Sequence, residues 1–277
     1  MDVSLPAGLY IVATPIGNLG DITLRAIEVL RGVAAVACED TRVTGRLLHH
    51  LGIEQRMIRY DDHASQADRA RLLTLAREAP VALVSDAGTP LISDPGYRLA
   101  REAREVGIAV TSIPGASAAT VALTISGLPT DRYLFAGFLP ARSGARDRIL
   151  SELAGVLATL VFYETAPRLL DALAAIGTAL PGREVAVARE LTKRFEECRS
   201  GSAEALAAHY SEHPPKGEIV LMVGPPVRGP AELDATAIDA LLRTELERSK
   251  PSQAAASVAR ATGLDRRMLY ARALEIR

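Results

Sequence analysis

The sequence predicts an α/β protein with two α/β domains followed by a small helical domain. Three short apolar runs carry this prediction, because each ends in a turn rich in Gly and Pro and leads toward a helical pattern. The turns span residues 14–18, 85–90 and 113–118. Such turns are typical of the carboxyl ends of strands in an open α/β sheet, where ligands bind. Three in one domain predict a shaped pocket; the alternative is that they are ordinary connections.

Length and composition leave room for this architecture and exclude several classes of protein. A chain of 277 residues, 48% of them hydrophobic, can build two α/β cores. The 32 Lys and Arg against 33 Asp and Glu exclude a globally basic binder but allow a local basic patch. Cys38 and Cys198 are far apart and form no redox or ligand pattern, which fits a reducing compartment. Without a long apolar run or a signal-peptide pattern, we expect a soluble cytoplasmic protein that does not enter a membrane.

The first predicted domain, residues 1–122, alternates strands and helices. Apolar runs predict strands at 9–13, 33–37, 81–84 and 109–113. After the first strand, Leu24, Ile27 and Leu30 recur at helical spacing, with Asp21 as the expected N-cap. Further helices are expected at 66–77 and 97–106. This βαβ alternation predicts a mostly parallel sheet.

The second predicted domain, residues 123–226, begins near the turn-rich segment 126–131. Strands are expected at 159–163, 185–188 and 217–223, and a helix at 169–176. Two of these strands end at acidic residues, Glu164 and Glu190.

The third predicted domain, residues 227–277, starts with a linker that contains one short helix. From residue 249 on, the chain carries six Lys and Arg against two acids. Ser252 is the expected cap of a helix that ends before a turn at Thr262 and Gly263, and Asp265 is the expected cap of a second helix with Leu269 and Leu274. Two short helices around a Gly turn resemble a helix-turn-helix. The alternative is a solvated helical cap.

Several common motifs of enzymes are missing from the sequence. It contains no G-x-G-x-x-G after the first strand, no G-x-x-x-x-G-K-[ST] and no G-x-S-x-G. No His- or Cys-rich spacing suggests zinc, so we expect no metal site.

Seven segments together resemble the signature blocks of one protein family. They are ATPIGNLGD (13–21), EDTR (39–42), SDAGTPLISDPG (85–96), IPGASA (113–118), GFLP (137–140), FYETAPR (162–168) and ARELTK (188–193). The chain is similar to the ribosomal RNA small subunit methyltransferase I family of the tetrapyrrole-methylase superfamily, and its tail resembles that family's small helical domain.

The resemblance implies a fold, a cofactor and a substrate. It implies two α/β domains of the tetrapyrrole-methylase type with S-adenosyl-L-methionine in the cleft between them. The implied substrate is the 2′-hydroxyl of a cytidine in the decoding region of 16S rRNA in the small ribosomal subunit, and the implied assembly is a homodimer. Tetrapyrrole enzymes usually have G-D-P where this chain has Gly88-Thr89-Pro90, which weakens the case for a porphyrin-like substrate.

The same resemblance suggests which residues hold the methyl donor and the RNA. The expected cofactor-binding residues are Pro15, Asp86, Gly88, Thr89, Pro90, Ile92, Ser117, Ala118 and Tyr163. Glycine there admits close approach and proline limits reorganisation. The expected substrate-binding residues are Arg25, Arg42, Lys193, Arg142 and Arg146, the last two in an RNA-facing patch. The alternative for that patch is a solvated basic face.

A ribose hydroxyl is a weak nucleophile, and a carboxylate that accepts its proton typically contributes ~10²–10⁴-fold in rate. Glu39, Asp40, Glu164 and Glu190 lie at predicted strand ends. We favour Glu190 as the catalytic base, with Asp40 second. The alternatives are that each carboxylate pairs with a neighbouring Arg, or that the proton passes directly to water.

The sequence leaves two other functions open. One is C-methylation of a tetrapyrrole precursor, which the basic tail and Thr89 disfavour. The other is a non-enzymatic ribosome-binding protein, which the presence of all three turns disfavours.

Overall fold

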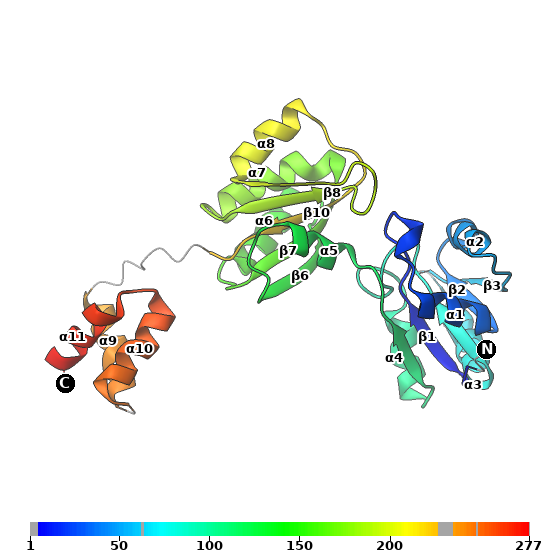
Figure 1. Cartoon of the computed structure of the whole chain (residues 1–277), viewed down its shortest axis with the longest axis horizontal. Helices are drawn as coiled ribbons and strands as arrows, with labels where there is room; N and C mark the ends of the chain where they lie inside the picture. Colours follow the sequence, from blue (N-terminus) through cyan, green and yellow to red (C-terminus); the bar gives the residue numbers. More distant parts are fainter. Residues whose placement is uncertain (1–4, 62–63, 227–234, 248, 277) are drawn as a thin grey trace. The chain divides into compact units, whose positions relative to one another are not determined.

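The computed structural model describes residues 5–61, 64–226, 235–247 and 249–276. The chain divides into two compact units, the first ending at Pro225 and the second beginning at Pro226. The larger unit contains two five-stranded sheets, and the smaller one contains helices α9 to α11 (Figure 1).

The first sheet is parallel throughout, as the βαβ alternation predicted, with strand order β3-β2-β4-β1-β5. Its strands are β1 (Gly8–Val12), β2 (Ala35–Cys38), β3 (Met57–Arg59), β4 (Pro80–Leu83) and β5 (Val110–Ile113). The edge strand β3 was not expected from the sequence.

Both faces of the first sheet are covered, because side chains of the buried strand β1 alternate between two cores. Tyr10 and Val12 pack with helices α1 (Leu24–Gly32) and α2 (Thr41–His50). Leu9 and Ile11 pack on the opposite face with α3 (Gln66–Glu78) and α4 (Tyr97–Glu105). A strand buried on both faces reads as a continuous apolar run, which is the pattern that 9–13 shows.

The N-cap expected at Asp21 is wrong. Asp21 closes a short 3₁₀ helix, η1 (Leu19–Asp21), and Thr23 caps α1 by accepting a hydrogen bond from the Ala26 N–H. Both residues have the side-chain oxygen that a cap needs, and only the position of the preceding turn decides between them.

The second sheet is mixed, with strand order β6-β7-β10-β8-β9. Its strands are β6 (Tyr133–Phe138), β7 (Thr159–Thr165), β8 (Val185–Arg189), β9 (Glu197–Gly201) and β10 (Glu218–Val223). Only β6 and β7 pair in parallel, and the remaining pairs are antiparallel.

Helices cover both faces of the second sheet as well. Helices α6 (Ser143–Leu153), α7 (Leu169–Ala179) and α8 (Ala203–Glu212) pack on one face, and the 3₁₀ helix η2 (Ala166–Arg168) leads into α7. On the other face lies α5 (Ala118–Ile125), whose Ala119, Ala122 and Leu123 contact residues of β7, β8 and β10. Helix α5 follows β5 of the first sheet, so the chain links the two sheets through a packed helix.

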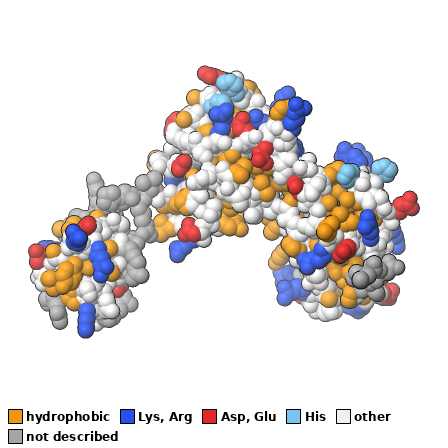
Figure 2. Space-filling view, in the orientation of Figure 1, with side chains coloured by type: hydrophobic (Ala, Val, Ile, Leu, Met, Phe, Trp, Pro, Cys, Tyr) orange, Lys and Arg blue, Asp and Glu red, His pale blue; other side chains and the backbone are white. Residues whose placement is uncertain are grey.

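The C-terminal unit packs three helices around its own small core. The helices are α9 (Ala235–Leu246), α10 (Pro251–Thr262) and α11 (Arg266–Glu275), and the core residues are Leu242, Ala255, Val258, Leu269 and Ala273. Asp239 of α9 accepts two hydrogen bonds of 2.7 Å from the Arg272 guanidinium of α11. The visible face of this unit shows apolar and cationic side chains close together (Figure 2).

The predicted turn and one predicted cap of this unit are confirmed, and the other predicted cap is wrong. Gly263 ends α10 in a left-handed conformation, and Asp265 caps α11 by accepting from the Arg267 and Met268 N–H groups. Ser252 is not a cap, because the helix begins two residues earlier than expected, at Pro251, whose fixed φ favours the first helical position. Leu269 and Leu274 both lie on α11 as predicted, the first buried and the second exposed. The expected linker runs from 227 to about 248 and contains one short helix. Its first part, 227–234, lies outside the described part of the chain, and the expected helix corresponds to α9.

No helix in the described part of the chain combines the length and the apolar composition that crossing a bilayer requires.

Candidate functional site

The three turns predicted from the sequence meet at the carboxyl edge of the first sheet. Thr14 and Gly88 exchange two backbone hydrogen bonds, with N–O distances of 2.8 and 3.1 Å. The Thr89 hydroxyl donates to the Ala116 carbonyl at 3.0 Å, and so joins the third turn to the second. Backbone and hydroxyl groups therefore tie the ends of β1, β4 and β5 into one rigid edge.

This edge forms one wall of a cavity of about 310 Å³, within the range of small-molecule sites. The first sheet and its loops contribute Ile16, Glu39, Asp86, Ala87, Gly88, Thr89, Ile92, Ser93, Asp94, Ser117 and Ala118. The second sheet and its loops contribute Phe138, Tyr163, Glu164, Glu190, Leu191, Lys193, Glu218, Ile219 and Val220. We call this cavity the main pocket.

The main pocket is strongly acidic. Six carboxylates line it against a single lysine, Lys193: Glu39, Asp86, Asp94, Glu164, Glu190 and Glu218. An excess of carboxylates favours a positively charged ligand over an anion such as phosphate.

Most of the expected cofactor-binding residues line the main pocket, namely Asp86, Gly88, Thr89, Ile92, Ser117, Ala118 and Tyr163. The two prolines do not: Pro15 and Pro90 flank pocket residues without lining the pocket themselves. Tyr163 packs edge-on against Phe138 with ring centres 5.6 Å apart, and burial raises the pKa of its phenol. Sequence reasoning missed Phe138, Asp94 and Glu218.

Glu190 and Lys193 form an ion pair within the main pocket, with Oε1 and Nζ 2.9 Å apart. The lysine stem packs on the first turn of the chain, since a Cβ added to Gly17 would lie 2.8 Å from Lys193 Cγ and Cε. The Glu190 carboxylate lies against Gly217, where an added Cβ would be 2.7 Å from Oε1. A Cβ at position 17 or 217 would therefore force the Lys193 or Glu190 side chain to move from this geometry.

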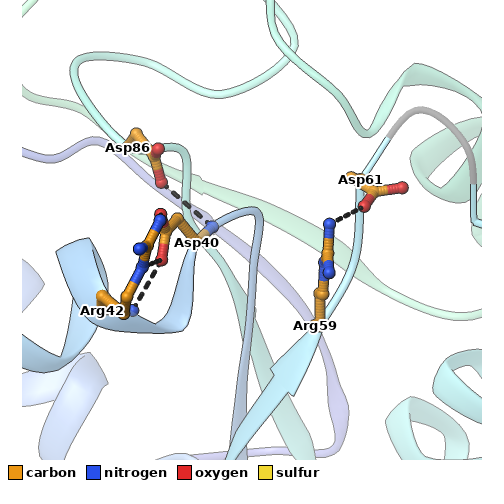
Figure 3. A network of polar contacts seen from close by, with 5 residues as sticks. All are labelled: Asp40, Arg42, Arg59, Asp61 and Asp86. Carbon is orange, nitrogen blue, oxygen red and sulfur yellow. Dashed lines mark hydrogen bonds and ion pairs between the residues drawn. The ribbon is translucent and has the colours of Figure 1, made fainter.

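Asp40 lies outside the main pocket. It caps α2 by accepting from the Arg42 N–H at 2.8 Å, and its carboxylate pairs with the Arg42 guanidinium at 2.6 Å (Figure 3). Hydrogen bonds from the Arg42 side chain and backbone hold the pKa of the Asp40 carboxyl well below its usual range. The ion pair that the sequence left open as an alternative is therefore present.

A second hollow of about 370 Å³ adjoins the main pocket. Glu39, Asp40, Thr41, Arg42, Arg59 and Asp86 line it, and two of these, Glu39 and Asp86, also line the main pocket. The Asp40 N–H donates to Asp86 Oδ1 at 3.2 Å across it. We call this hollow the side pocket.

Glu164 is a fully buried carboxylate at the base of the main pocket. It accepts from the Thr165 N–H at 2.9 Å and pairs with the Arg168 guanidinium at 3.1 Å. Burial raises the pKa of the Glu164 carboxyl, although the bonding N–H and the guanidinium act in the opposite direction.

The prediction that Arg146 contacts RNA is wrong, because this residue is buried. Its residue is only 6% exposed, and its guanidinium is 3.9 Å from the Asp171 carboxylate. Its Nε is buried without a hydrogen-bond partner. By contrast, Arg25 on α1 and Arg142 at the start of α6 are exposed, and neither lines the main pocket. Arg42 lines only the side pocket.

In the described part of the chain, four non-glycine residues adopt left-handed backbone conformations, and all lie beside the main pocket. They are Leu91, Ser93, Glu190 and Thr192, with φ between 51° and 73°. Such conformations cost ~1–3 kcal/mol each and cluster at functional sites. No sequence signal marks them, because none is the Gly or Asn that usually occupies this region.

Among the described residues, no group of three or more His, Cys, Asp or Glu side chains is arranged to hold a metal ion.

Each of the two units matches a known family model. Residues 8–207 match the family model described as Tetrapyrrole (Corrin/Porphyrin) Methylases, and residues 232–277 match the model described as the RsmI C-terminal HTH domain. A solved uroporphyrin-III-C-methyltransferase from Thermus thermophilus superposes with a TM-score of 0.56 at 25% identity, over 79% of this chain and 94% of that chain. The predicted fold class is thus confirmed.

Two curated relatives are similar over nearly their whole length. A protein of Erythrobacter litoralis is 63% identical over 273 residues, which cover 99% of this chain and 96% of the relative. A protein of Mesorhizobium japonicum is 50% identical over 277 residues, which cover 99% of this chain and 93% of the relative. Both relatives carry the name ribosomal RNA small subunit methyltransferase I.

Proposed function

The chain belongs to the ribosomal RNA small subunit methyltransferase I family, and on this basis we propose that it is an rRNA methyltransferase that uses S-adenosyl-L-methionine. We further propose that it methylates the 2′-hydroxyl of a cytidine in the decoding region of 16S rRNA. The relatives' name supports a small-subunit rRNA substrate. The main pocket, which is lined by acids and lies at the three joined turns, is the observation that supports S-adenosyl-L-methionine as the methyl donor.

The residues present fit this donor. S-adenosyl-L-methionine, when bound, supplies an electrophilic methyl group on a positively charged sulfonium. The six carboxylates favour such a cation. Because Gly88 has no Cβ, its backbone is accessible from the pocket; a Cβ there would lie 3.3 Å from Cγ2 of Ile16, another pocket residue. The joined turns present backbone groups that need not reorganise on binding.

We propose that Glu190 accepts the proton that the ribose hydroxyl loses during transfer. Its carboxylate lines the pocket and is held by Lys193, so the proton would pass to an oxygen in a fixed position. Asp40 is the weaker candidate because it lies outside the main pocket, where its carboxylate caps α2 and pairs with Arg42. Glu39 and Glu164 also line the pocket, and direct loss of the proton to water needs no base.

We propose that the C-terminal unit binds the RNA. Arg266 and Arg267 are exposed at the start of α11, and Tyr270 is exposed one turn further on. Arginine can bind phosphate and tyrosine can stack on unpaired bases. A cytoplasmic homodimer that acts on the small ribosomal subunit completes the proposal.

One transfer assay tests this function. Small ribosomal subunits that lack the methyl group are incubated with the protein and S-adenosyl-L-methionine tritiated on the methyl carbon. The proposal expects tritium in 16S rRNA, at a single cytidine whose 2′-oxygen is methylated. Label in a tetrapyrrole precursor instead, or no transfer to either substrate by protein that binds the donor, would contradict it.

A further inference from the structure

Three hollows on the larger unit form a continuous series through the residues they share. The main pocket and the side pocket have Glu39 and Asp86 in common. The side pocket and a third hollow of about 260 Å³ have Arg59 in common. The third hollow is lined by Arg56, Ile58, Arg59, Asp68, Arg71, Leu72 and Leu75, and we call it the basic groove.

The basic groove lies between the edge strand β3 and helix α3. Strand β3 is at the end of the sheet order, and its Arg59 is in register with Cys38, the residue that precedes Glu39. The Arg59 side chain lies across the side pocket from Asp40 and Arg42 (Figure 3). The pairing of β2 with β3 therefore holds the basic groove next to the side pocket.

The charge of the basic groove is opposite to that of the main pocket. Three arginines line it against one acid, Asp68. Oδ2 of that carboxylate accepts from the Ser65 N–H at 3.1 Å and the Ser65 hydroxyl at 2.7 Å, and these bonds lower the pKa of Asp68. Oδ1 forms a long ion pair of 3.7 Å with Arg71. The Arg71 side chain is 82% exposed, so most of its five donors remain available to a second anion.

The other two arginines are also accessible. Arg56 is exposed at the start of β3. Arg59 keeps 76% of its side chain exposed while it pairs with Asp61 at 3.0 Å. The Asp61 carboxylate holds the Arg59 guanidinium in one orientation and engages only some of its five N–H donors.

We propose that the basic groove binds the phosphates of a single-stranded RNA segment next to the methylated nucleotide, whose nucleoside enters through the side pocket. This proposal rests on the proposed function. A neutral ribose and base can enter the acidic pockets, whereas their flanking phosphates are repelled there and attracted by the three arginines. Half-buried Ile58 and Leu75 provide an apolar floor between the charges.

The test compares two double variants with the same loss of charge. Arg56→Gln with Arg71→Gln alters the groove, and Arg77→Gln with Arg104→Gln alters exposed arginines of α3 and α4 that do not line it. Binding to protein-free 16S rRNA is measured by filter retention from 50 to 200 mM salt, without methyl donor. Arg59→Gln is measured alone, because its ion pair with Asp61 is close, at 3.0 Å, whereas that of Arg71 with Asp68 is long, at 3.7 Å.

The groove variant should bind about tenfold more weakly at low salt, and the slope of log affinity against log salt should fall by about 1.4, since each phosphate contact on single strands contributes ~0.7. The control variant should match the wild type. Equal affinity and slope in the two double variants would overturn the proposal. So would an effect seen only with assembled subunits, because the groove would then bind a ribosomal protein.

The same measurements separate this proposal from the proposed function. If the wild type binds rRNA through the groove but transfers no methyl group, the function fails and the groove stands. If it methylates rRNA and the groove variant is unaffected in both affinity and KM, the groove proposal fails and the function stands.

Discussion

Thr14 and Gly88 exchange a pair of backbone hydrogen bonds although 74 positions separate them in the chain. The bonds join the turn after β1 to the turn after β4 and hold both at the wall of the main pocket. Gly88 has a φ of +82°, so a residue without a Cβ is favoured at this junction.

Gly88→Val should weaken donor binding at least about tenfold, equivalent to ~1.4 kcal/mol. The new Cβ would lie 3.3 Å from Ile16 Cγ2 at the pocket wall, and valine strongly disfavours positive φ. Isothermal titration calorimetry with S-adenosyl-L-methionine measures the effect.

The matched control is Gly107→Val. Gly107 has a similar φ of +75°, but an added Cβ there meets no atom within 4 Å and the residue does not line the pocket. It should lose stability to a similar extent and keep its donor affinity. Unchanged affinity in folded Gly88→Val, or activity that chelation removes and a divalent ion restores, would contradict the proposed donor site.

Glu190→Gln should slow single-turnover methyl transfer by about 10²-fold while donor and RNA affinities stay near those of the wild type. The change keeps the shape of the side chain and removes the charge that would accept the proton. The measurement is the single-turnover rate against pH, with thermal unfolding in parallel.

Glu218→Gln is the matched control, since it removes a carboxylate from the same pocket at the start of β10. It should leave the pH profile unchanged. If Glu190→Gln transfers at the wild-type rate but unfolds at a lower temperature, the carboxylate serves only the ion pair with Lys193, and the base assignment is lost.

Glu164→Gln should change how stability depends on pH. Burial raises the pKa of Glu164 above its ordinary value of 4.5, so in the window above that value the folded protein keeps a proton that the unfolded chain has lost. The wild type therefore loses stability relative to the variant as pH rises through this window. Urea unfolding of both proteins from pH 4 to 8 measures the difference, and a difference that is constant or of opposite sign would refute the prediction.

Removal of the C-terminal unit should weaken rRNA binding and flatten its salt dependence while donor affinity is retained. The cut belongs after Pro225, because a deletion that starts at residue 249 would leave α9 with Leu242 exposed. Arg266→Gln with Arg267→Gln should reproduce part of the loss in the full chain, with Arg77→Gln and Arg104→Gln as the control. Full methylation and unchanged salt dependence in the truncated protein would make the unit a structural cap.

Much of the first sheet could be predicted because its central strands are buried on both faces and form continuous apolar runs. Strand β3 could not, since Met57, Ile58 and Arg59 are exposed or half-buried and show no periodicity. Helix α5 was missed because nearly all its residues are apolar, which hides the 3.6-residue period. The antiparallel pairing of β10 was also missed, because it depends on β9 and α8, two elements that the sequence pattern did not reveal.

In the candidate site, the turns could be predicted from the sequence, but the set of side chains that meet in the pocket could not. The turn at Gly88 and Thr89 could be predicted because the local sequence is typical of turns. Asp94 and Glu218 meet in one pocket only because distant segments fold together. Arg146 resembles its exposed neighbours Arg142 and Arg148 in sequence, and its burial is decided by contact with α7, which carries Asp171.

The left-handed residues around the main pocket have a consequence for directed evolution toward heat resistance. Glycine at Ser93 or Thr192 would relieve backbone strain, so a screen that scores only survival at high temperature should enrich it there. Those same substitutions would loosen the loops that present Ile92 and Leu191 to the ligand. Thermal selection and turnover should therefore favour different residues at these two positions, and a library that varies them must be scored for both.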